Sequence, residues 1–481
     1  MNNVLVSRKF YLSDQKYFAR LSGDYNLMHL NPISSRRELY GNVVVHGIHA
    51  VVWMLEVFFG AQKSNRDNLI DIVSLDVQFL SPIYLNKVVN IRLISSEGNN
   101  VHLQLLQAEQ VLVELYFSFC SRLAVRKVKI CSNICENKNP MDLTFDQLRN
   151  KEGTLELFFE ANVAKKKFPV LTQILNLFCF AEILAMTRLV GMHCPGMCSI
   201  FSALKFKNYE DKSQDKHLTY KVVKIHDKFK LVKINVENSS LFAEIEAFYR
   251  PMPYQQLFFK DVIRHVKSDE FSGKTSLVLG GSRGLGEITA KIFAGGGGKV
   301  VITYHKGVED AKRVRNEIKD AGFDCEYISY DVNRPDDMLD RLAKITSGVD
   351  YIFFFATPKI AKSSIFNMDN FKLYNSYYVD GFYKIYKSYR TRYNNDIKIF
   401  YPSTVYLDEK ALDFGDYISA KYAAEILCEQ IQKIDRRIYV LVKRLPRMAT
   451  DQTQSLTRHF SENAFEFMLK TVRELNALKL V

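Results

Sequence analysis

The sequence lacks the features that would place it in a membrane or on a nucleic acid. No apolar run reaches membrane-spanning length without charges. The first residues, MNNVLVSRKFYLSD, contain no apolar core of the signal-peptide type. The formal net charge is +13, yet no dense Lys/Arg block and no DNA-binding motif accompanies it. We therefore expect a cytoplasmic protein with no nucleic acid and no membrane among its partners.

The sequence is also poor in cysteine patterns that bind metal. Its eight cysteines are scattered, largely among apolar neighbours. Cys131/Cys135 and Cys194/Cys198 form Cys-x3-Cys pairs, whose spacing differs from that of the usual zinc knuckles. We therefore expect free thiols, as in a reducing compartment, and no metal site.

The composition is that of an ordinary globular protein, with 47% apolar and 25% charged residues. A chain of 481 residues is too long for one hydrophobic core and suggests about three domains. The positive charge allows two interpretations. It is either a generally basic surface or a complement to an anionic partner, such as the phosphates of CoA or an acidic acyl carrier protein.

The N-terminal part of the chain repeats one pattern. Residues 47–61, GIHAVVWMLEVFFGA, are apolar on nearly all sides, as in a helix that a sheet wraps around. The strand-like runs that follow it are 72–85, 88–98, 101–110 and 111–121. The same order recurs farther on, where a long apolar helix over 168–192 precedes more strand-like runs. The sequence thus predicts two copies of one α+β fold, over 1–127 and 150–255.

A third part, residues 270–481, has strands that alternate with helices, which predicts a parallel α/β sheet. It opens with TSLVLGGSRGLGEITAKIFAGGGGKVVITY, which reads as strand, glycine turn, helix and strand. Such a turn lets the backbone approach a pyrophosphate at the start of the helix. The predicted dinucleotide contacts are Gly280, Gly281, Ser282, Arg283, Gly284, Leu285 and Gly286.

The end of the second strand indicates which dinucleotide binds. An NAD site usually places an acid there for the ribose hydroxyls. Here the sequence reads Thr303-Tyr304-His305-Lys306, without an acid. Arg283 and Lys306 have the charge to pair with a 2′-phosphate, and guanidinium suits phosphate well. We therefore predict NADPH, with His305 and Lys306 at the site, and NADH as the alternative if Lys306 is only a solvated loop residue.

A Tyr-x3-Lys pair lies farther along, in GDYISAKYAAEILCEQI. Its four-residue spacing places Tyr417 and Lys421 on one face of a helix. An ammonium near a phenol favours the phenolate, so Tyr417 can act as acid or base near neutral pH. Ser403 follows the strand-like DIKIFYPS and can hydrogen-bond the carbonyl group of a substrate.

With these residues and the glycine turn, the chain from about residue 272 to 450 resembles a short-chain dehydrogenase/reductase. The resemblance implies that Ser403 orients the substrate and that Tyr417 donates or accepts the proton. It also implies that Lys421 binds the ribose and lowers the pKa of the tyrosine.

The same resemblance covers the adenine side of the cofactor and includes departures. It implies an adenine contact from Asp331-Val332, while Ala356-Thr357 stand where the family has Asn-Ala, beside the cofactor. The family's helix asparagine would fall near Tyr378, and its Pro-Gly is Pro446-Arg447 here. The tail after residue 450 reads as a helix where the family has its last strand.

The stretch SGDYNLMH, at 22–29, brings together an acid and a base. Dehydration needs one group for the hydroxyl and another for the carbon-bound proton, and Asp24 and His29 are suited to these tasks. A backbone N–H near Gly47, at the start of a helix, can polarise the carbonyl group. The other interpretation is a helix-capping aspartate and a surface histidine.

The longer stretch FARLSGDYNLMHLNP, followed by VVHG, resembles the R-specific enoyl-CoA hydratases, which are MaoC-like hot-dog dehydratases. Their motif reads SGDxNPxHxD, and the resemblance implies that Asp24 and His29 are catalytic. Leu27 replaces the proline of the motif and Asn31 its last acid. The second repeat has no Asp-x4-His pair, so we expect it to shape the acyl tunnel, with His193 structural.

Together the two resemblances imply a double hot-dog followed by a Rossmann domain, in a bifunctional enzyme of acyl-thioester metabolism. NADPH would reduce a 3-oxoacyl-CoA or acyl carrier protein thioester to the (R)-3-hydroxyacyl form. The dehydratase would then produce the trans-2-enoyl thioester, or add the water back.

Three alternatives remain open from the residues alone. One is an NAD-dependent 3-hydroxyacyl dehydrogenase plus hydratase in acyl breakdown. A second is a reductase of a sugar or another carbonyl compound in a polysaccharide or secondary-metabolite pathway. The third is an acyl-binding scaffold without catalysis. Reductases of this kind generally dimerise through the helix that carries Tyr-x3-Lys, so we expect a homodimer.

Overall fold

The structure is a computed structural model that describes residues 4–62, 69–122, 138–209, 215–334, 337–363, 365–457 and 459–478. The chain divides into two compact units. The first comprises Met1–Met252 with Ser455–Arg458, and the second comprises Pro253–Gln454 with His459–Val481. The predicted pair Cys131/Cys135 lies outside the described residues. Among the described residues, no helix is long and apolar enough to cross a membrane.

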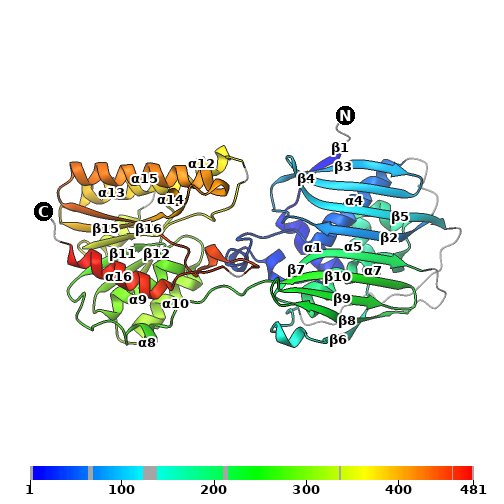
Figure 1. The fold of residues 1–481 in the computed structure, drawn as a ribbon, viewed down its shortest axis with the longest axis horizontal. Coiled ribbons are helices and arrows are strands. Elements are labelled where there is room, and N and C mark those ends of the chain that lie inside the picture. Colours follow the sequence, from blue (N-terminus) through cyan, green and yellow to red (C-terminus); the bar gives the residue numbers. More distant parts are fainter. Residues whose placement is uncertain are drawn as a thin grey trace. The chain divides into compact units, whose positions relative to one another are not determined.

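The first unit is built on one antiparallel ten-stranded sheet, in the order β1-β3-β4-β5-β2-β7-β10-β9-β8-β6 (Figure 1). Its two halves have the same strand order from edge to centre, where β2 pairs with β7 between Ser74↔Lys207 and Gln78↔Ala203. The strands are β1 (Val4–Lys9), β2 (Leu69–Phe79), β3 (Val88–Glu97), β4 (Asn100–Gln107), β5 (Gln110–Arg122), β6 (Glu152–Glu156), β7 (Ser199–Asn208), β8 (His217–His226), β9 (Leu231–Glu237) and β10 (Leu241–Tyr249).

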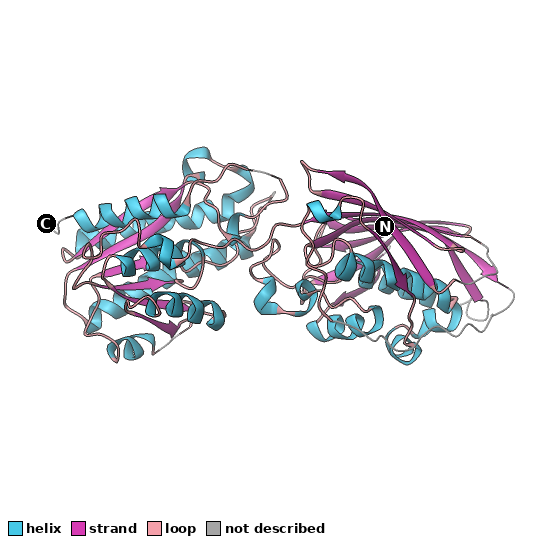
Figure 2. Cartoon of the chain, turned by 90° about the horizontal axis from the view of Figure 1, so that it is seen from below, coloured by secondary structure: helices cyan, strands magenta, loops and turns pink. Residues whose placement is uncertain are grey.

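Helices cover one face of this curved sheet (Figure 2). The strands alternate between buried and more exposed residues, as Val232, Ile234 and Val236 do in β9, so one face of the sheet is apolar. The inward residues of both halves join the helices in one continuous core. The helices are α1 (Leu12–Ser22), α2 (Leu27–Leu30), α3 (Pro32–Ser35), α4 (Gly47–Ala61), α5 (Ala161–Lys167), α6 (Pro169–Ile174) and α7 (Leu177–Arg188).

The continuous helix expected over 168–192 is wrong. The chain forms α6, a break, α7 and then a π-helical turn over Leu189–His193. Leu175 bridges to Ile70 of β2, and the backbone N–H of Asn176 donates to the carbonyl of Ile70. The side chain of Asn176 then caps α7 by accepting from the N–H of Phe178. Pairing with a distant strand therefore interrupts a helix that the apolar periodicity would have continued.

The second unit is a six-stranded parallel sheet in the order β13-β12-β11-β14-β15-β16. This is the order of a Rossmann fold, and the two sheets confirm the predicted fold class. The strands are β11 (Thr275–Leu279), β12 (Lys299–Tyr304), β13 (Cys325–Ser329), β14 (Tyr351–Phe354), β15 (Ile397–Thr404) and β16 (Ile438–Leu445).

Helices cover both faces of the parallel sheet (Figure 1). Leu277 and Leu279 of β11 face one core and Val278 faces the other, because side chains alternate along a strand. After β16, the described part of the chain forms α16 instead of a further strand, and α16 packs on α9. The helices are α8 (Phe259–Val262), α9 (Gly284–Gly295), α10 (Val308–Lys319), α11 (Met338–Ala343), α12 (Met368–Asn375), α13 (Phe382–Arg392), α14 (Tyr406–Glu409), α15 (Gly415–Ile434) and α16 (Ala464–Ala477).

Candidate active sites

Asp24 lies in a tight loop directly after α1. Gly23 ends the helix in the left-handed conformation, with φ of 78°, which favours glycine. The Asp24 side chain is buried, with 1% of the residue exposed. Its Oδ1 accepts the N–H of Asn26 at 3.1 Å, and its Oδ2 accepts the hydroxyl of Thr187 at 2.7 Å. A hydrogen bond at each of its two oxygens therefore holds the carboxyl group.

His29 lies on α2, one helical turn beyond the loop. Asn26 caps this helix by accepting the N–H of Met28. The Nδ1 of His29 lies 2.9 Å from the carbonyl oxygen of Val44. Because a carbonyl oxygen only accepts, Nδ1 carries the proton in the neutral ring and Nε2 is left with its lone pair. The loop and the helix thus present a carboxyl group and an imidazole base together.

Burial moves the pKa values of these two groups in opposite directions. It raises the pKa of Asp24, while the charge of His29 and the hydrogen bond from Thr187 act to lower it. It lowers the pKa of His29, against the opposing effect of the Asp24 charge. Both shifts favour the uncharged pair, a carboxylic acid beside a neutral imidazole.

His46 is a third member of this cluster, and it was not among the predicted site residues. One donor atom from each of Asp24, His29 and His46 lies within 4.8 Å of the others. The His46 ring stacks on the His29 ring at 3.9 Å, and its Nε2 lies 3.1 Å from the backbone oxygen of Asp24. Its Nδ1 lies 2.9 Å from Oε1 of Gln15. The available signal was the VVHG stretch itself, which places His46 directly before the start of α4.

Gly47 begins α4, directly after His46. A Cβ atom at this position would lie 2.7 Å from the ring of Phe79, so a side chain here would displace that ring. The first N–H groups of α4 have no partner within the helix, and the helix dipole adds partial positive charge there. This is the end of α4 at which the sequence predicted a group that polarises a carbonyl.

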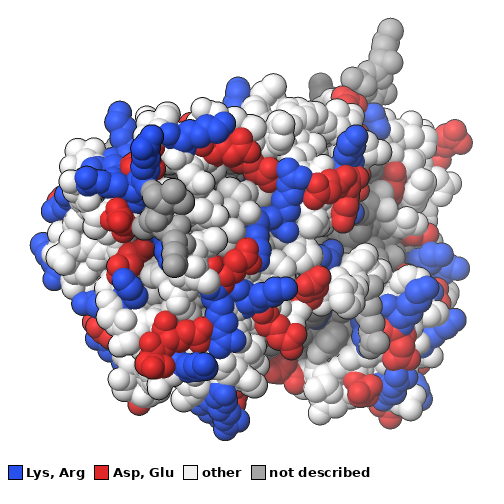
Figure 3. All heavy atoms as spheres, turned by 60° about the vertical axis from the view of Figure 1, so that its left-hand side comes forward, with Lys and Arg blue, Asp and Glu red and all other residues white. Residues whose placement is uncertain are grey.

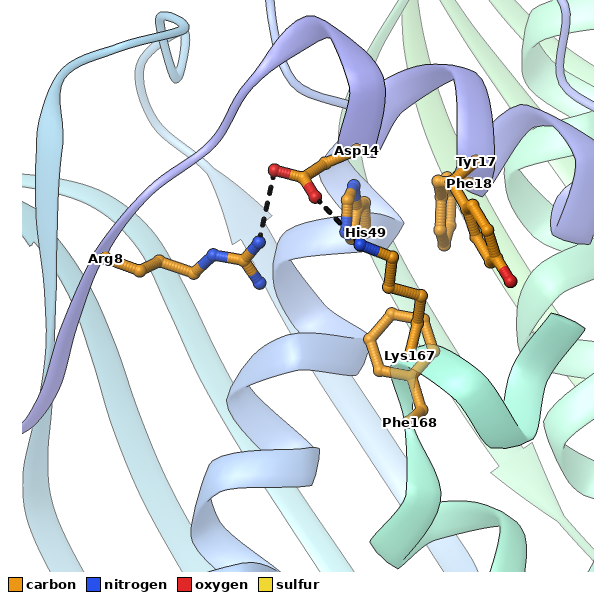
Figure 4. Close-up of a pocket in the computed structure, with 7 residues that line it drawn as sticks. All are labelled: Arg8, Asp14, Tyr17, Phe18, His49, Lys167 and Phe168. Carbon is orange, nitrogen blue, oxygen red and sulfur yellow. Dashed lines mark hydrogen bonds and ion pairs between the residues drawn. The ribbon is translucent and has the colours of Figure 1, made fainter.

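A small pocket lies beside this cluster, lined by Arg8, Asp14, Tyr17, Phe18, His49, Lys167 and Phe168 (Figure 4). Asp14 lies between Arg8 and Lys167, with nitrogen–oxygen distances of 3.3 Å to each (Figure 4). His49 lines the pocket, and its Nδ1 is 3.4 Å from the same Gln15 Oε1 that faces His46. The pKa of His49 is lowered to about 3, chiefly by burial. A neutral, buried polar link therefore runs from the pocket towards the Asp24 cluster.

The glycine turn of the second unit has the shape that a bound diphosphate requires. Gly280 and Gly284 have φ of 80° and 59°, in the left-handed region that favours glycine. A Cβ atom at Gly286 would overlap the carbonyl oxygen of Gly280. Ser282 is buried in the turn, and Leu285 lies in the first turn of α9. The predicted residues 280–286 thus form one tight strand-to-helix turn, which fits a dinucleotide.

Two cations contact the same residue, Asp451, beside this turn. Arg283 Nη1 lies 3.5 Å from Oδ2 of Asp451, and Lys359 Nζ lies 3.4 Å from the backbone oxygen of Asp451. Burial, together with the charge of Arg283, lowers the pKa of Lys359 to about 8. Lys359 was not foreseen, because it follows β14 at a position without a family motif. Arg283, Lys359 and the start of α9 are the groups in this region that could hold phosphate.

The predicted adenine-side residues lie at the ends of β12 and β13. Nε2 of His305 lies 3.3 Å from Oδ2 of Asp331, while Lys306 is exposed. Val332 is buried and packs closely against Gly381, where a Cβ atom would lie 3.2 Å from the valine side chain. The structure therefore brings His305 and Asp331 together and leaves the Lys306 side chain in solvent.

The helix position expected for asparagine is filled by an aromatic ring. Tyr378 lies in a π-helical segment, Ser376–Gly381, between α12 and α13. Its hydroxyl lies 2.6 Å from that of Thr357, which follows Ala356 after β14. Its ring meets the Tyr417 ring edge-on at 5.7 Å. Tyr378 therefore ties the β14 end to the Tyr417 helix without supplying an amide.

Thr404, and not Ser403, lies with Tyr417. A hydrogen bond from the Thr404 side chain acts to lower the pKa of Tyr417. The Ser403 side chain instead acts to lower the pKa of Glu425. Successive side chains of β15 point to opposite faces, so only one of the two residues can face the tyrosine. Ser403 as the residue that orients the substrate stays a prediction, and Thr404 is a second candidate for that role.

Lys421 is buried on α15, the helix that also carries Tyr417. Its Nζ donates to the carbonyl oxygen of Pro402 at 2.6 Å and lies 3.9 Å from the centre of the Tyr378 ring. Burial lowers the pKa of Lys421 to about 7. Burial also raises the pKa of Tyr417. That Lys421 binds the ribose and lowers the pKa of the tyrosine stays a prediction. The aromatic ring and the carbonyl hold the ammonium group here.

Comparison with known proteins identifies both parts of the chain. A family model for the MaoC like domain matches residues 5–114, and one for short chain dehydrogenase matches residues 274–358. With the hot-dog-like antiparallel sheet and the Rossmann sheet, these matches confirm the resemblances. The chain carries an N-terminal MaoC-like dehydratase domain and a C-terminal short-chain dehydrogenase domain. These domains indicate an enzyme, an oxidoreductase combined with a dehydratase.

Relatives among curated proteins match only short stretches. A short chain dehydrogenase of Claviceps purpurea is 36% identical over 83 residues, which are 17% of this chain and 31% of the relative. Versicolorin reductase of Emericella nidulans is 42% identical over 64 residues, 13% of this chain and 24% of the relative. The chain therefore spans less than half the length of these relatives.

Solved structures are similar as well. A short chain dehydrogenase from Burkholderia cenocepacia, in complex with NADP, has a TM-score of 0.39 and 23% identity, covering 43% of this chain and 91% of that one. A 3-oxoacyl (acyl-carrier-protein) reductase from Agrobacterium tumefaciens with NADP bound has a TM-score of 0.35 and 18% identity, covering 38% and 73%.

Proposed function

We propose that the protein is a bifunctional enzyme of acyl thioesters. Its second unit reduces a 3-oxoacyl thioester with NADPH, and its first unit dehydrates the resulting (R)-3-hydroxyacyl thioester to the trans-2-enoyl form. The observation that carries the proposal is the buried Asp24–His29 pair, in which Val44 sets the histidine tautomer. The same chain carries a reductase fold whose Tyr417 lies beside Thr404. The product of one unit is thus the substrate of the other.

In the dehydratase, His29 acts as the base and Asp24 acts as the acid. Nε2 of His29 takes the proton from C2, and the electron pair of the C2–H bond forms the C2=C3 double bond. The C3–O bond breaks, and Asp24, as a carboxylic acid, gives its proton to the leaving hydroxyl, which departs as water. The N–H groups at the start of α4, beside Gly47, stabilise the negative charge on the thioester oxygen. Return of the proton from His29 to Asp24 restores the site.

In the reductase, we propose that the phosphates of NADPH are held by the glycine turn with Arg283 and Lys359, and that His305, Lys306 and Asp331 lie at the adenine end. The bound cofactor supplies the hydride. The hydroxyl of Tyr417 gives its proton to the carbonyl oxygen, and the Thr404 hydroxyl orients that oxygen. Because burial keeps Tyr417 in the neutral form, it is suited to act as the acid.

The direct test supplies a short 3-oxoacyl-CoA with NADPH or NADH in parallel and follows nucleotide oxidation and the mass of the thioester. The expected result is faster oxidation of NADPH, with a 3-hydroxyacyl product that loses water. Faster use of NADH would favour the acyl-breakdown alternative. If neither nucleotide is oxidised and the enoyl-CoA is not hydrated, on CoA or on acyl carrier protein, the proposal is wrong.

A second candidate for the reductase half is a cyclic or aromatic ketone of secondary metabolism. Aromatic rings surround the tyrosine, since Tyr374 and Tyr378 both lie 5.7 Å from the Tyr417 ring. A relative that matches over a short stretch is named versicolorin reductase. A panel that contains 3-oxoacyl-CoAs, sugars and polycyclic ketones separates the candidates by their kcat/KM values.

A further inference from the structure

The second half of the first unit reaches the Asp24 loop directly. Thr187, in the last turn of α7, is buried, and its hydroxyl donates to Oδ2 of Asp24 at 2.7 Å. Thr187 lies 163 positions away in the sequence, within the repeat that has no catalytic motif. This contact is therefore a property of the folded pair of halves and of neither half alone.

The backbone of the same half also packs against Asp24. A Cβ atom at Gly191 would overlap the Asp24 carboxyl group, so no side chain fits at this position. The side-chain amide of Asn26 donates to the backbone oxygens of Gly191 at 3.1 Å and Gly196 at 3.2 Å. The loop that carries Asp24 is thus fastened to the second half on both sides of the carboxyl group.

A hydroxyl partner suits a carboxyl group that changes protonation state. The O–H of threonine can donate to a carboxylate, and its oxygen can accept from a carboxylic acid. The other oxygen, Oδ1, accepts the N–H of Asn26, so rotation of the carboxyl group would break a bond at each oxygen. Valine has nearly the same shape as threonine and offers neither bond.

We propose that Thr187 is a positioning residue of the dehydratase site, through which the second half fixes the carboxyl group of Asp24 relative to His29. This inference rests on the proposed dehydratase function of Asp24 and His29. It gives the half without a motif a defined part in catalysis, beyond the shaping of an acyl tunnel.

The experiment compares Thr187→Val with Thr187→Ser in the full chain. The matched control is Thr172→Val, because Thr172 lies on α6 and its hydroxyl bonds to the backbone oxygen of Phe168. Hydration of a short trans-2-enoyl-CoA is followed. We expect kcat to fall about 10- to 100-fold in Thr187→Val, since small misplacements of a catalytic group have effects of this size. KM should change less than about twofold, Thr187→Ser should restore most of the rate, and Thr172→Val should match wild type.

A pH titration of Asp24 tests its contact with Thr187 without a measurement of turnover. The Asp24 carboxyl is assigned by 13C NMR through its loss in Asp24→Asn, and its pKa is compared in wild type and Thr187→Val. Loss of a hydrogen bond to the carboxylate should raise the pKa further. If wild type hydrates no enoyl thioester, the proposed function fails, and the titration still reports on Thr187. An unchanged Asp24 pKa, or a Thr187→Val enzyme as fast as wild type, would overturn the role of Thr187.

Discussion

In both candidate sites a single hydroxyl group interacts with the proposed reacting group. Thr187 holds one oxygen of Asp24, and Thr404 lies with Tyr417 at the end of β15. Neither Thr187 nor Thr404 belongs to the sequence motifs from which the sites were predicted. A hydroxyl is effective there because it can donate or accept, so it serves both protonation states of its partner.

The contact of Thr404 with Tyr417 gives a prediction that separates Thr404 from Ser403 in the proposed reductase. We expect Thr404→Val to lower kcat about 100-fold, since removal of one oriented donor has effects of this size. Ser403→Ala should stay within about threefold of wild type, since its side chain lies on the other face of β15. The measurement is steady-state reduction of the best carbonyl substrate at saturating NADPH. Equal losses in the two variants would contradict the assignment.

At the scale of elements, the ends of strands and helices bring distant residues together. The turn between β11 and α9 supplies Arg283, the segment after β14 supplies Lys359, and the segment after β16 supplies Asp451. Each segment follows the carboxyl end of a parallel strand, where ligand sites of such sheets lie. Asp451 thus contacts one cation through its carboxylate and the other through its backbone oxygen.

This arrangement predicts opposite effects on nucleotide affinity. We expect Lys359→Met to weaken NADPH binding about tenfold, because it removes a cation near the phosphates. Asp451→Asn should strengthen binding, because it removes the anion that competes for Arg283. Isothermal titration measures both affinities, with Asp261→Asn as the control, since Asp261 pairs only at the surface with Arg264. Weaker binding by Asp451→Asn would mean that Asp451 supports the site instead.

Helix α7 carries a buried acid that makes stability depend on pH. Burial raises the pKa of Glu182 to about 7, although Asn238 and Ser240 donate to its Oε1 at 3.0 Å. Between the ordinary carboxyl pKa and about 7, the folded protein keeps a proton that the unfolded chain has lost. Rising pH therefore lowers the free energy of unfolding through this window, by about 3 kcal/mol.

Glu182→Gln removes the ionisation and keeps an acceptor for the same two donors. We expect this variant to lose the part of the stability decline between pH 5 and 8 that Glu182 causes, about 3 kcal/mol. Urea unfolding of the first unit at the two pH values measures it. Glu152→Gln is the control, because Glu152 is exposed and pairs with Lys221 at the surface. A wild-type slope in Glu182→Gln would show that other groups cause the decline.

At the scale of the whole molecule, two units carry two kinds of chemistry on one chain. The net charge is +13, and on the face in Figure 3 Lys and Arg are interspersed with Asp and Glu. That face shows no broad surface of one sign (Figure 3). Binding of CoA phosphates or of an acidic carrier protein therefore stays a prediction, as does the homodimer.

The proposed reactions should separate cleanly by mutation. Asp24→Asn should still oxidise NADPH with a 3-oxoacyl-CoA and accumulate the 3-hydroxyacyl thioester, because its reductase unit is intact. Tyr417→Phe should still hydrate an enoyl-CoA and leave NADPH unused. Losses of at least about 100-fold are expected at the mutated site. Mass analysis of the thioesters follows both variants, and loss of both activities in either single variant would contradict two independent sites.

Much of the fold could be predicted because its signals are local. Alternation over residues 101–110 indicates a strand wherever it packs, and the glycine turn at 280–286 needs its conformations whatever lies nearby. The helix over 168–192 was wrong because Leu175 and Asn176 pair with β2, which periodicity within one segment does not reveal.

The sequence by itself determined the two domain types, the Asp24–His29 pair and the Tyr417–Lys421 pair, since each depends on spacing within a few residues. Only the tertiary structure brings Thr187 and His46 to Asp24, Lys359 to the glycine turn and Thr404 to Tyr417. The physical reason is distance along the chain. A hydroxyl that bonds a carboxyl group 163 positions away leaves no pattern in the local sequence, and which of two adjacent strand residues faces a tyrosine depends on the register of the whole sheet.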